Sequence, residues 1–94
     1  MSGEYDKIVL YQHPISPPSM YCVMVFNYLG IDYINYEINV FKGEVKQPWY
    51  LKVNPNGAIP SIRDVNGFCT NEGIAITRYI SNVLLSSLFI IHFS

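Results

Sequence analysis

The sequence predicts an α/β domain in which seven elements follow the order β-α-β-α-β-β-α and four strands form one mixed sheet. Three observations indicate this arrangement. A helical segment lies between the first two β-prone runs, which implies a parallel pair of strands. Asn66-Gly67 joins the last two runs as a hairpin, and a segment with helical spacing of apolar residues follows them. The chain has 94 residues, which is enough for one domain only.

The first strand and the first helix are separated by a proline-rich turn. Residues 8–11 are a short apolar run, and the three prolines within residues 13–19 end it because proline cannot pair in a β-ladder. Proline is tolerated in a first helical turn, so we expect Pro18 to open a helix that extends to about Leu29 and stops at Gly30. Apolar residues occupy every face of this helix, which predicts a surface that is covered on more than one side in an assembly and exposed in a lone copy of this domain.

The middle of the chain contains a second strand and a short helix. Residues 32–39 have a period of two, which is typical of a strand. We expect a loop at residues 41–44, a short helix at residues 48–51 and a turn at residues 54–57, where Asn-Pro-Asn-Gly is strong turn chemistry.

The chain closes with a hairpin and a helix. Strands at residues 61–64 and 68–70 flank the Asn66-Gly67 turn. Apolar residues at helical spacing from Glu72 to about Leu85 predict the last helix.

Composition and charge narrow the function classes. The net charge is −1, with six basic and seven acidic residues scattered singly, which argues against nucleic acid and anionic membranes as partners. Residues 1–7 hold no long apolar stretch, so we expect no signal peptide and a cytoplasmic protein. Cys22 and Cys69 lack metal-ligand spacing, and we expect two reduced, buried thiols and no metal site. The apolar tail at residues 84–94 is shorter than the roughly 20 residues that span a bilayer, so an extension of the last helix or the start of a second domain is favoured over a membrane anchor.

Four motifs occur in an order and at distances that are specific in combination. They are Ser-Pro-Pro between the first strand and helix (within residues 11–19), Phe-Lys-Gly-Glu at 41–44, Asn-Pro-Asn-Gly-Ala-Ile-Pro at 54–60 and Asn-Glu-Gly-Ile-Ala-Ile at 71–76. With these motifs, residues 7–83 resemble the thioredoxin-like, glutathione-binding N-terminal domain of theta-, delta- and epsilon-like glutathione transferases of the serine type. On this resemblance, residues 84–94 are the truncated start of a missing C-terminal helical domain.

The resemblance implies a glutathione site. Ser16 is expected to be the catalytic serine, whose hydroxyl donates a hydrogen bond to the glutathione sulfur; the alternative is a serine that only caps the helix. Pro60 is expected to be a cis-proline, and Ile59 and Pro60 are expected to bind the cysteinyl part of glutathione through the Ile59 backbone. The alternative for Pro60 is an ordinary trans proline that opens a strand. Glu72 is expected to bind the ammonium group of the γ-glutamyl residue, and the Gly73 N–H is expected to bind the carboxylate of the same residue. The alternative for Glu72 is an acid in the first helical turn that only complements the helix dipole.

Two other candidates at this site are weaker. Ser19 falls within the helix. Tyr11 could be the thiolate donor by analogy with tyrosine-type transferases, but we prefer a packing role for it. Ser16 and Ser19 also occupy the positions of Cys-x-x-Cys in related folds. Disulfide exchange requires a thiolate, so a dithiol oxidoreductase is excluded.

The function implied by the resemblance is conjugation of the glutathione thiolate to a small electrophilic substrate. Glutathione is the co-substrate, no metal is involved, and a homodimer is one assembly that the resemblance allows. Activity is expected to be weak without the C-terminal domain. The alternative is a non-catalytic dimerisation or docking module, as in the transferase-like domain of elongation factor 1 gamma. It is favoured by four departures from the family's pattern of polar ligands, at Met20, Val45, Gly57 and Gly73.

Overall fold

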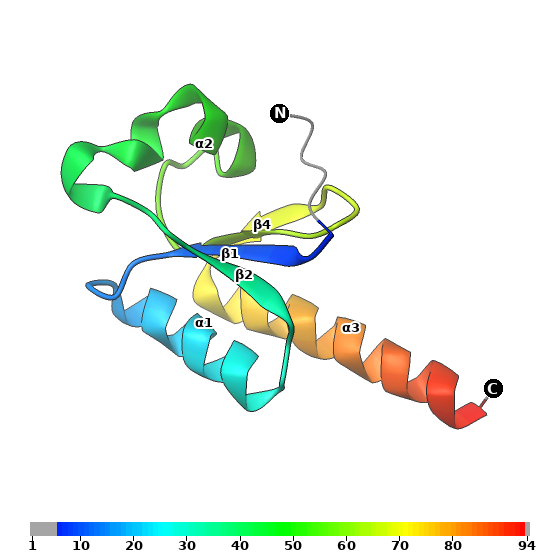
Figure 1. Cartoon of the computed structure of the whole chain (residues 1–94). Coiled ribbons are helices and arrows are strands. Elements are labelled where there is room, and N and C mark those ends of the chain that lie inside the picture. Colours follow the sequence, from blue (N-terminus) through cyan, green and yellow to red (C-terminus); the bar gives the residue numbers. More distant parts are fainter. Residues whose placement is uncertain (1–5, 94) are drawn as a thin grey trace.

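The computed structural model describes the backbone of residues 6–93 and the side chains of residues 6–86, and it confirms the predicted element order and mixed sheet (Figure 1). The strands are β1 (Ile8–Gln12), β2 (Tyr33–Glu37), β3 (Ser61–Arg63) and β4 (Cys69–Asn71). The α-helices are α1 (Pro17–Tyr28), α2 (Pro48–Val53) and α3 (Gly73–Phe93). Helix α2 covers one face of the sheet, while α1 and α3 lie side by side on the other face.

The sheet has the strand order β2-β1-β3-β4. Strand β1 pairs in parallel with β2 and antiparallel with β3, and β3 pairs antiparallel with β4. The crossover through α1 therefore produces the parallel pair that the sequence predicts, and the hairpin produces the antiparallel one.

Two apolar cores lie on opposite faces of the sheet because side chains alternate along β1. Leu10 points toward α1 and α3, where it packs with Phe26 and Ile76. Val9 points toward α2, where it packs with Tyr50. All five residues of β1 are buried, as expected for a central strand.

Most element boundaries differ from the sequence prediction by one or two residues, and a few differ more. The expected loop at residues 41–44 lies within two 3-10 turns, η1 (Val40–Lys42) and η2 (Glu44–Lys46). The Glu44 carboxylate folds this segment back, since it accepts hydrogen bonds from the Asn39 N–H at 2.7 Å and the Tyr36 hydroxyl at 2.6 Å. Strand β4 is displaced by one residue from the expected 68–70.

The last helix also differs from its predicted limits, because it begins at Gly73 and continues to Phe93. Glu72 has φ of 70°, outside the α-helical region, so it cannot be part of the helix. The expected tail at residues 84–94 is thus helical as far as residue 93, and residue 94 lies outside the described residues. No helix among residues 6–93 combines the length and apolarity that a membrane crossing requires.

Within the described residues, helix α1 is covered on one face only, as expected for a copy of this domain on its own. Ser19, Cys22 and Phe26 are buried against the sheet and α3. Tyr21, Met24 and Tyr28 remain 48%, 69% and 89% exposed. These three positions have helical i, i+3, i+7 spacing and therefore form one apolar stripe.

Candidate glutathione site

The register of the sheet brings the predicted site segments to one edge. Tyr11 lies opposite Ser61, and Ser61 lies opposite Asn71. The turn that follows β1, the Ile59-Pro60 segment that precedes β3 and the Glu72-Gly73 segment that follows β4 therefore emerge at the same end of the sheet. Near this edge, the first turns of α1 and α3 also meet, because a Cβ atom on Gly73 would lie 3.7 Å from the Pro18 carbonyl oxygen.

Ser16 occupies the N-cap position of α1. Its side-chain oxygen accepts a hydrogen bond from the Ser19 N–H at 3.3 Å, and its backbone is extended. The capping role is therefore present in the fold. A hydroxyl has one proton and two acceptor lone pairs, so capping leaves the Ser16 proton available for donation to a second partner.

The first turn of α1 offers few other donors. Pro17 and Pro18 have no N–H, the Ser19 N–H is bonded to the Ser16 hydroxyl oxygen, and the Met20 N–H is bonded to the Ser16 carbonyl at 3.0 Å. An anion near this helix terminus is normally bound by free N–H groups. Here the Ser16 hydroxyl is the half-buried donor that the terminus can still present.

The Ile59-Pro60 segment adjoins β3, and its peptide bond is cis. Pro60 is buried and Ile59 is half-buried. Within residues 6–93, the backbone N–H and C=O of Ile59 take part in no hydrogen bond of the fold. They are therefore available to an extended peptide laid beside the sheet.

A buried polar network holds the loop before Ile59. The Tyr50 hydroxyl donates to the Ala58 carbonyl at 2.6 Å and contacts the Ser61 hydroxyl oxygen at 2.6 Å. The Asn54 amide nitrogen donates to the same carbonyl at 2.9 Å, and its oxygen accepts from the Asn71 side chain at 3.1 Å. Burial raises the pKa of Tyr50, although its hydrogen bonds to Ser61 and Asn54 act in the opposite direction, so the hydroxyl remains a donor.

The sequence does not predict this network. It places Asn54 in a turn and in the motif at residues 54–60, and it offers Asn71 as a possible cap of the last helix, but it assigns no contact between them and no role to Tyr50. The Asn54–Asn71 contact joins side chains 17 residues apart, so no local pattern could have revealed it. The one available signal was Asn54 itself, a polar residue next to apolar Val53 in a segment expected to approach the site.

Glu72 and Gly73 lie at the junction between β4 and α3. The Glu72 side chain is exposed. The Glu72 backbone carbonyl accepts the Ile76 N–H at 2.9 Å, so Glu72 is the N-cap residue that precedes the first turn of α3. The alternative interpretation of Glu72 as an acid inside the first turn is therefore wrong. Gly73 is the first helical residue, with an N–H at the positive end of the helix dipole.

The weaker candidates are buried. Tyr11 is 2% exposed, and its ring contacts those of Tyr36, Trp49 and Tyr50, which agrees with a packing role. Ser19 is fully buried within α1.

Neither cysteine is in a disulfide. Burial raises the pKa of Cys22 to about 11, so this thiol stays protonated and is not a nucleophile at neutral pH. Cys69 is only half-buried, contrary to the expectation that both thiols are buried.

Two of the departures from the family pattern have a structural counterpart. Val45 packs against the core beneath α2. Gly57 has φ of 61°, and a Cβ atom there would lie 3.0 Å from the Lys46 ammonium nitrogen and 3.2 Å from the Val45 carbonyl oxygen. The space that a side chain at position 57 would need is therefore already occupied.

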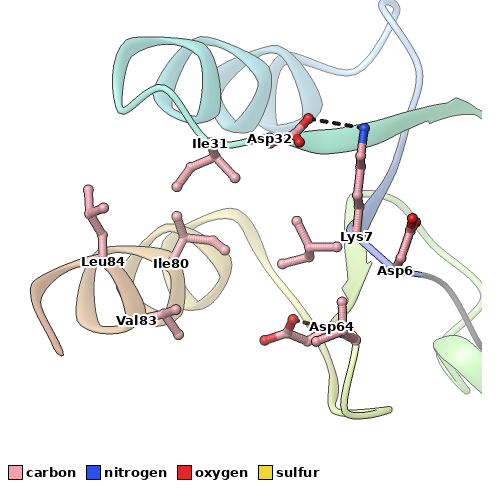
Figure 2. A pocket seen from close by; sticks show the side chains of 10 residues that line it. Asp6, Lys7, Ile31, Asp32, Asp64, Ile80, Val83 and Leu84 are labelled. Atoms are coloured by element: carbon pink, nitrogen blue, oxygen red, sulfur yellow. Dashed lines mark hydrogen bonds and ion pairs between the residues drawn. The ribbon is translucent and has the colours of Figure 1, made fainter. Parts of the chain in front are cut away.

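A hollow of about 380 Å³ lies at the other end of the sheet, where β1 begins (Figure 2). Figure 2 shows Ile80, Val83 and Leu84 from α3 across from Ile31 and from the Lys7–Asp32 ion pair, whose charged atoms are 3.4 Å apart. Both partners of this pair are solvent-exposed, so it contributes little stability. No residue of the predicted glutathione site lines this hollow.

Comparisons with known proteins identify the same part of the chain. A family model for the glutathione S-transferase N-terminal domain matches residues 15–83. Glutathione S-transferase D6 of Drosophila melanogaster is 34% identical over 71 residues, which cover 76% of this chain and 33% of that protein. Glutathione S-transferase 3 of Zea mays is 36% identical over 73 residues, which cover 78% of this chain and 32% of that protein. The chain thus spans about a third of the length of these curated relatives.

Solved structures agree on the fold. An epsilon-class glutathione S-transferase from the housefly, Musca domestica, superposes with a TM-score of 0.76 at 29% identity, covering 81% of this chain and 34% of the housefly chain. The glutathione transferase URE2P6 from Phanerochaete chrysosporium, crystallised with oxidized glutathione, gives a TM-score of 0.74 at 38% identity, covering 79% of this chain and 34% of its own. These likenesses confirm the expected thioredoxin-like fold.

Proposed function

Because the chain belongs to the glutathione S-transferase N-terminal domain family, we propose that it binds glutathione at the sheet edge where Ser16, Ile59 and Glu72 emerge, and that it activates the thiol for conjugation. The proposal assigns the chain to the serine type. Glutathione is the co-substrate, a small electrophile is the second substrate, and no metal takes part.

The state of the α1 N-terminus is the observation that carries the proposal. Its first four backbone positions either lack an N–H or have one that is already bonded. Within the part of the chain that the structure describes, the Ser19 hydroxyl has no partner but is completely buried, so the half-buried Ser16 hydroxyl is the accessible donor for a sulfur anion. A free thiol has a pKa near 8.5, and lowering it by two units requires roughly 2.7 kcal/mol of preferential thiolate stabilisation. One hydrogen bond to a charged group contributes about 1.5–3 kcal/mol, which is of that size.

The rest of the site supplies complementary chemistry for the tripeptide. The Ile59 backbone groups can pair with the cysteinyl residue as an added strand would. The exposed Glu72 carboxylate suits the γ-glutamyl ammonium, and the Gly73 N–H suits the adjacent carboxylate.

Substitution of Ser16 tests the thiolate donor. In Ser16→Ala we expect the pKa of the bound glutathione thiol to rise by about two units toward its free value, with conjugation at neutral pH falling about 100-fold. Ultraviolet absorbance of the thiolate, followed against pH in the presence of saturating glutathione, measures the first quantity. Conjugation of a chlorodinitrobenzene acceptor measures the second.

A matched variant separates donation from capping. Aspartate is a good N-cap residue but has no proton to donate when ionised, so Ser16→Asp should keep the stability of α1 and still fail to lower the thiol pKa. Ser16→Ala should in addition lose about 1 kcal/mol of stability with the cap. An unchanged thiol pKa in both variants would show that Ser16 acts as a cap alone.

Gly73 offers a gain-of-affinity test. A side chain there would make ordinary contacts, at 3.6 Å to the Tyr21 ring and 3.7 Å to the Pro18 carbonyl oxygen, so serine can be accommodated. We expect Gly73→Ser to tighten glutathione binding about 10- to 100-fold through a hydrogen bond to the γ-glutamyl carboxylate. Calorimetric titration measures this change, and Gly73→Ala, which fills the same space without a hydroxyl, should not reproduce it.

The exposed stripe on α1 favours a second candidate function. Tyr21, Met24 and Tyr28 form an apolar surface of the kind that is covered in an assembly, which suits either a helical C-terminal domain, a homodimer or a docking module without catalysis. Soluble, folded protein that does not bind glutathione-agarose would exclude the transferase and leave the docking module as the better proposal.

A further inference from the structure

The two halves of the proposed site are joined by a pair of asparagine side chains. Asn71 is the last residue of β4 and directly precedes Glu72. Its amide nitrogen donates to the Asn54 side-chain oxygen at 3.1 Å. Asn54 in turn donates to the Ala58 carbonyl at 2.9 Å, next to Ile59.

Asn54 is an effective connector because it is fixed on several sides. It is 1% exposed, and its oxygen also accepts the Asn56 N–H at 3.0 Å. A buried amide with its donor and acceptor both engaged has little freedom to move without losing hydrogen bonds. The hydrogen bond to Asn54 therefore fixes the position of the Asn71 amide relative to the loop that carries Ile59.

The bridge lies where the backbone ladder ends. Ser61 opposite Asn71 is the last pair of the β3–β4 ladder, and Glu72 then adopts φ of 70°. A non-glycine residue in this region is costly and persists only when its surroundings hold it. The Asn71 side chain supplies such a restraint immediately before the strained residue.

We propose that Asn71 is a positioning residue that acts through Asn54 to fix Glu72 relative to the Ile59 backbone. It touches no part of the tripeptide itself. Glutathione spans both groups, since its γ-glutamyl end would meet Glu72 and its cysteinyl backbone would meet Ile59. The bridge therefore sets the spacing that the tripeptide must match, an inference that rests on the proposed function.

A pair of ligands tests this role against general structural support. Glutathione engages both halves of the site, whereas cysteinylglycine lacks the γ-glutamyl group and engages only the Ile59 half. In Asn71→Leu, which keeps the approximate shape of the side chain without its donor, we expect about tenfold weaker binding of glutathione by calorimetric titration. Binding of cysteinylglycine should be unchanged.

Two further variants keep the test decisive. Asn71→Ala serves if leucine prevents folding. Thr70→Val is the matched control on the same strand, because Thr70 takes no part in the Asn71–Asn54–Ala58 bridge, and it should leave binding of both ligands unchanged.

Three outcomes would overturn the inference. Glutathione affinity that is unchanged in Asn71→Leu removes the positioning role, and equal weakening of both ligands reduces Asn71 to general support. Failure of the unmodified chain to bind glutathione removes the proposed function itself, and it is distinguished from the other two because it is measured before any variant is made.

Discussion

Replacing Phe26 with alanine is expected to lower the free energy of unfolding by about 3–5 kcal/mol. Phe26 is completely buried at the centre of the core between the sheet and helices α1 and α3. Its ring meets that of Tyr33 edge-on with centroids 4.9 Å apart. Its removal costs both the transfer free energy of the ring and the contacts that a cavity leaves unmade.

Urea denaturation measures this loss, with Tyr28→Ala as the matched control. Tyr28 is an aromatic residue of the same helix that is 89% exposed, so its replacement should change stability by no more than about 0.5 kcal/mol. Since small domains have little stability in reserve, Phe26→Ala is expected to be largely unfolded at ambient temperature. Comparable losses in the two variants would contradict the burial pattern of α1.

Much of the fold could be predicted because its strongest signals are local. The period of two in residues 32–39, the Asn66-Gly67 turn and the prolines before α1 each reflect a backbone preference that acts within a few residues. Boundaries were less predictable where a single side-chain hydrogen bond accompanies them. The Glu44 carboxylate winds residues 40–46 into 3-10 turns by binding the Asn39 N–H, which no short pattern encodes.

The site divides in the same way. Ser16, Ile59 and Glu72 stand in short motifs that can be recognised in sequence, and the register of the sheet places their segments at one edge. The supporting contacts could not be inferred, because Tyr50, Asn54 and Asn71 meet only after the sheet and α2 have formed. The exposed stripe on α1 agrees with the expectation that a lone copy of this domain leaves this helix partly uncovered, but hydrophobicity does not say what covers it.

Removing the Tyr50 hydroxyl is expected to lower the free energy of unfolding by about 1–3 kcal/mol. Tyr50→Phe keeps the ring packed against Tyr11, but it leaves the Ser61 hydroxyl, which is fully buried, without its partner. Tyr50→Phe combined with Ser61→Ala should be more stable than Tyr50→Phe alone, because an apolar pair leaves no polar group stranded. A double variant that is no more stable would show that the loss comes from the Ala58 contact instead.

A double-mutant cycle with Asn54 should then show strong coupling. In either Tyr50→Phe or Asn54→Leu, the Ala58 carbonyl keeps one of its two donors, and in the double variant it keeps neither. The double variant should therefore lose more stability in urea denaturation than the sum of the single losses, by about 0.5–3 kcal/mol. Additive losses would mean that water replaces the missing donors at Ala58. The loop before Ile59 would then depend on hydration for its position, and a site that requires a fixed Ile59 backbone would be poorly supported.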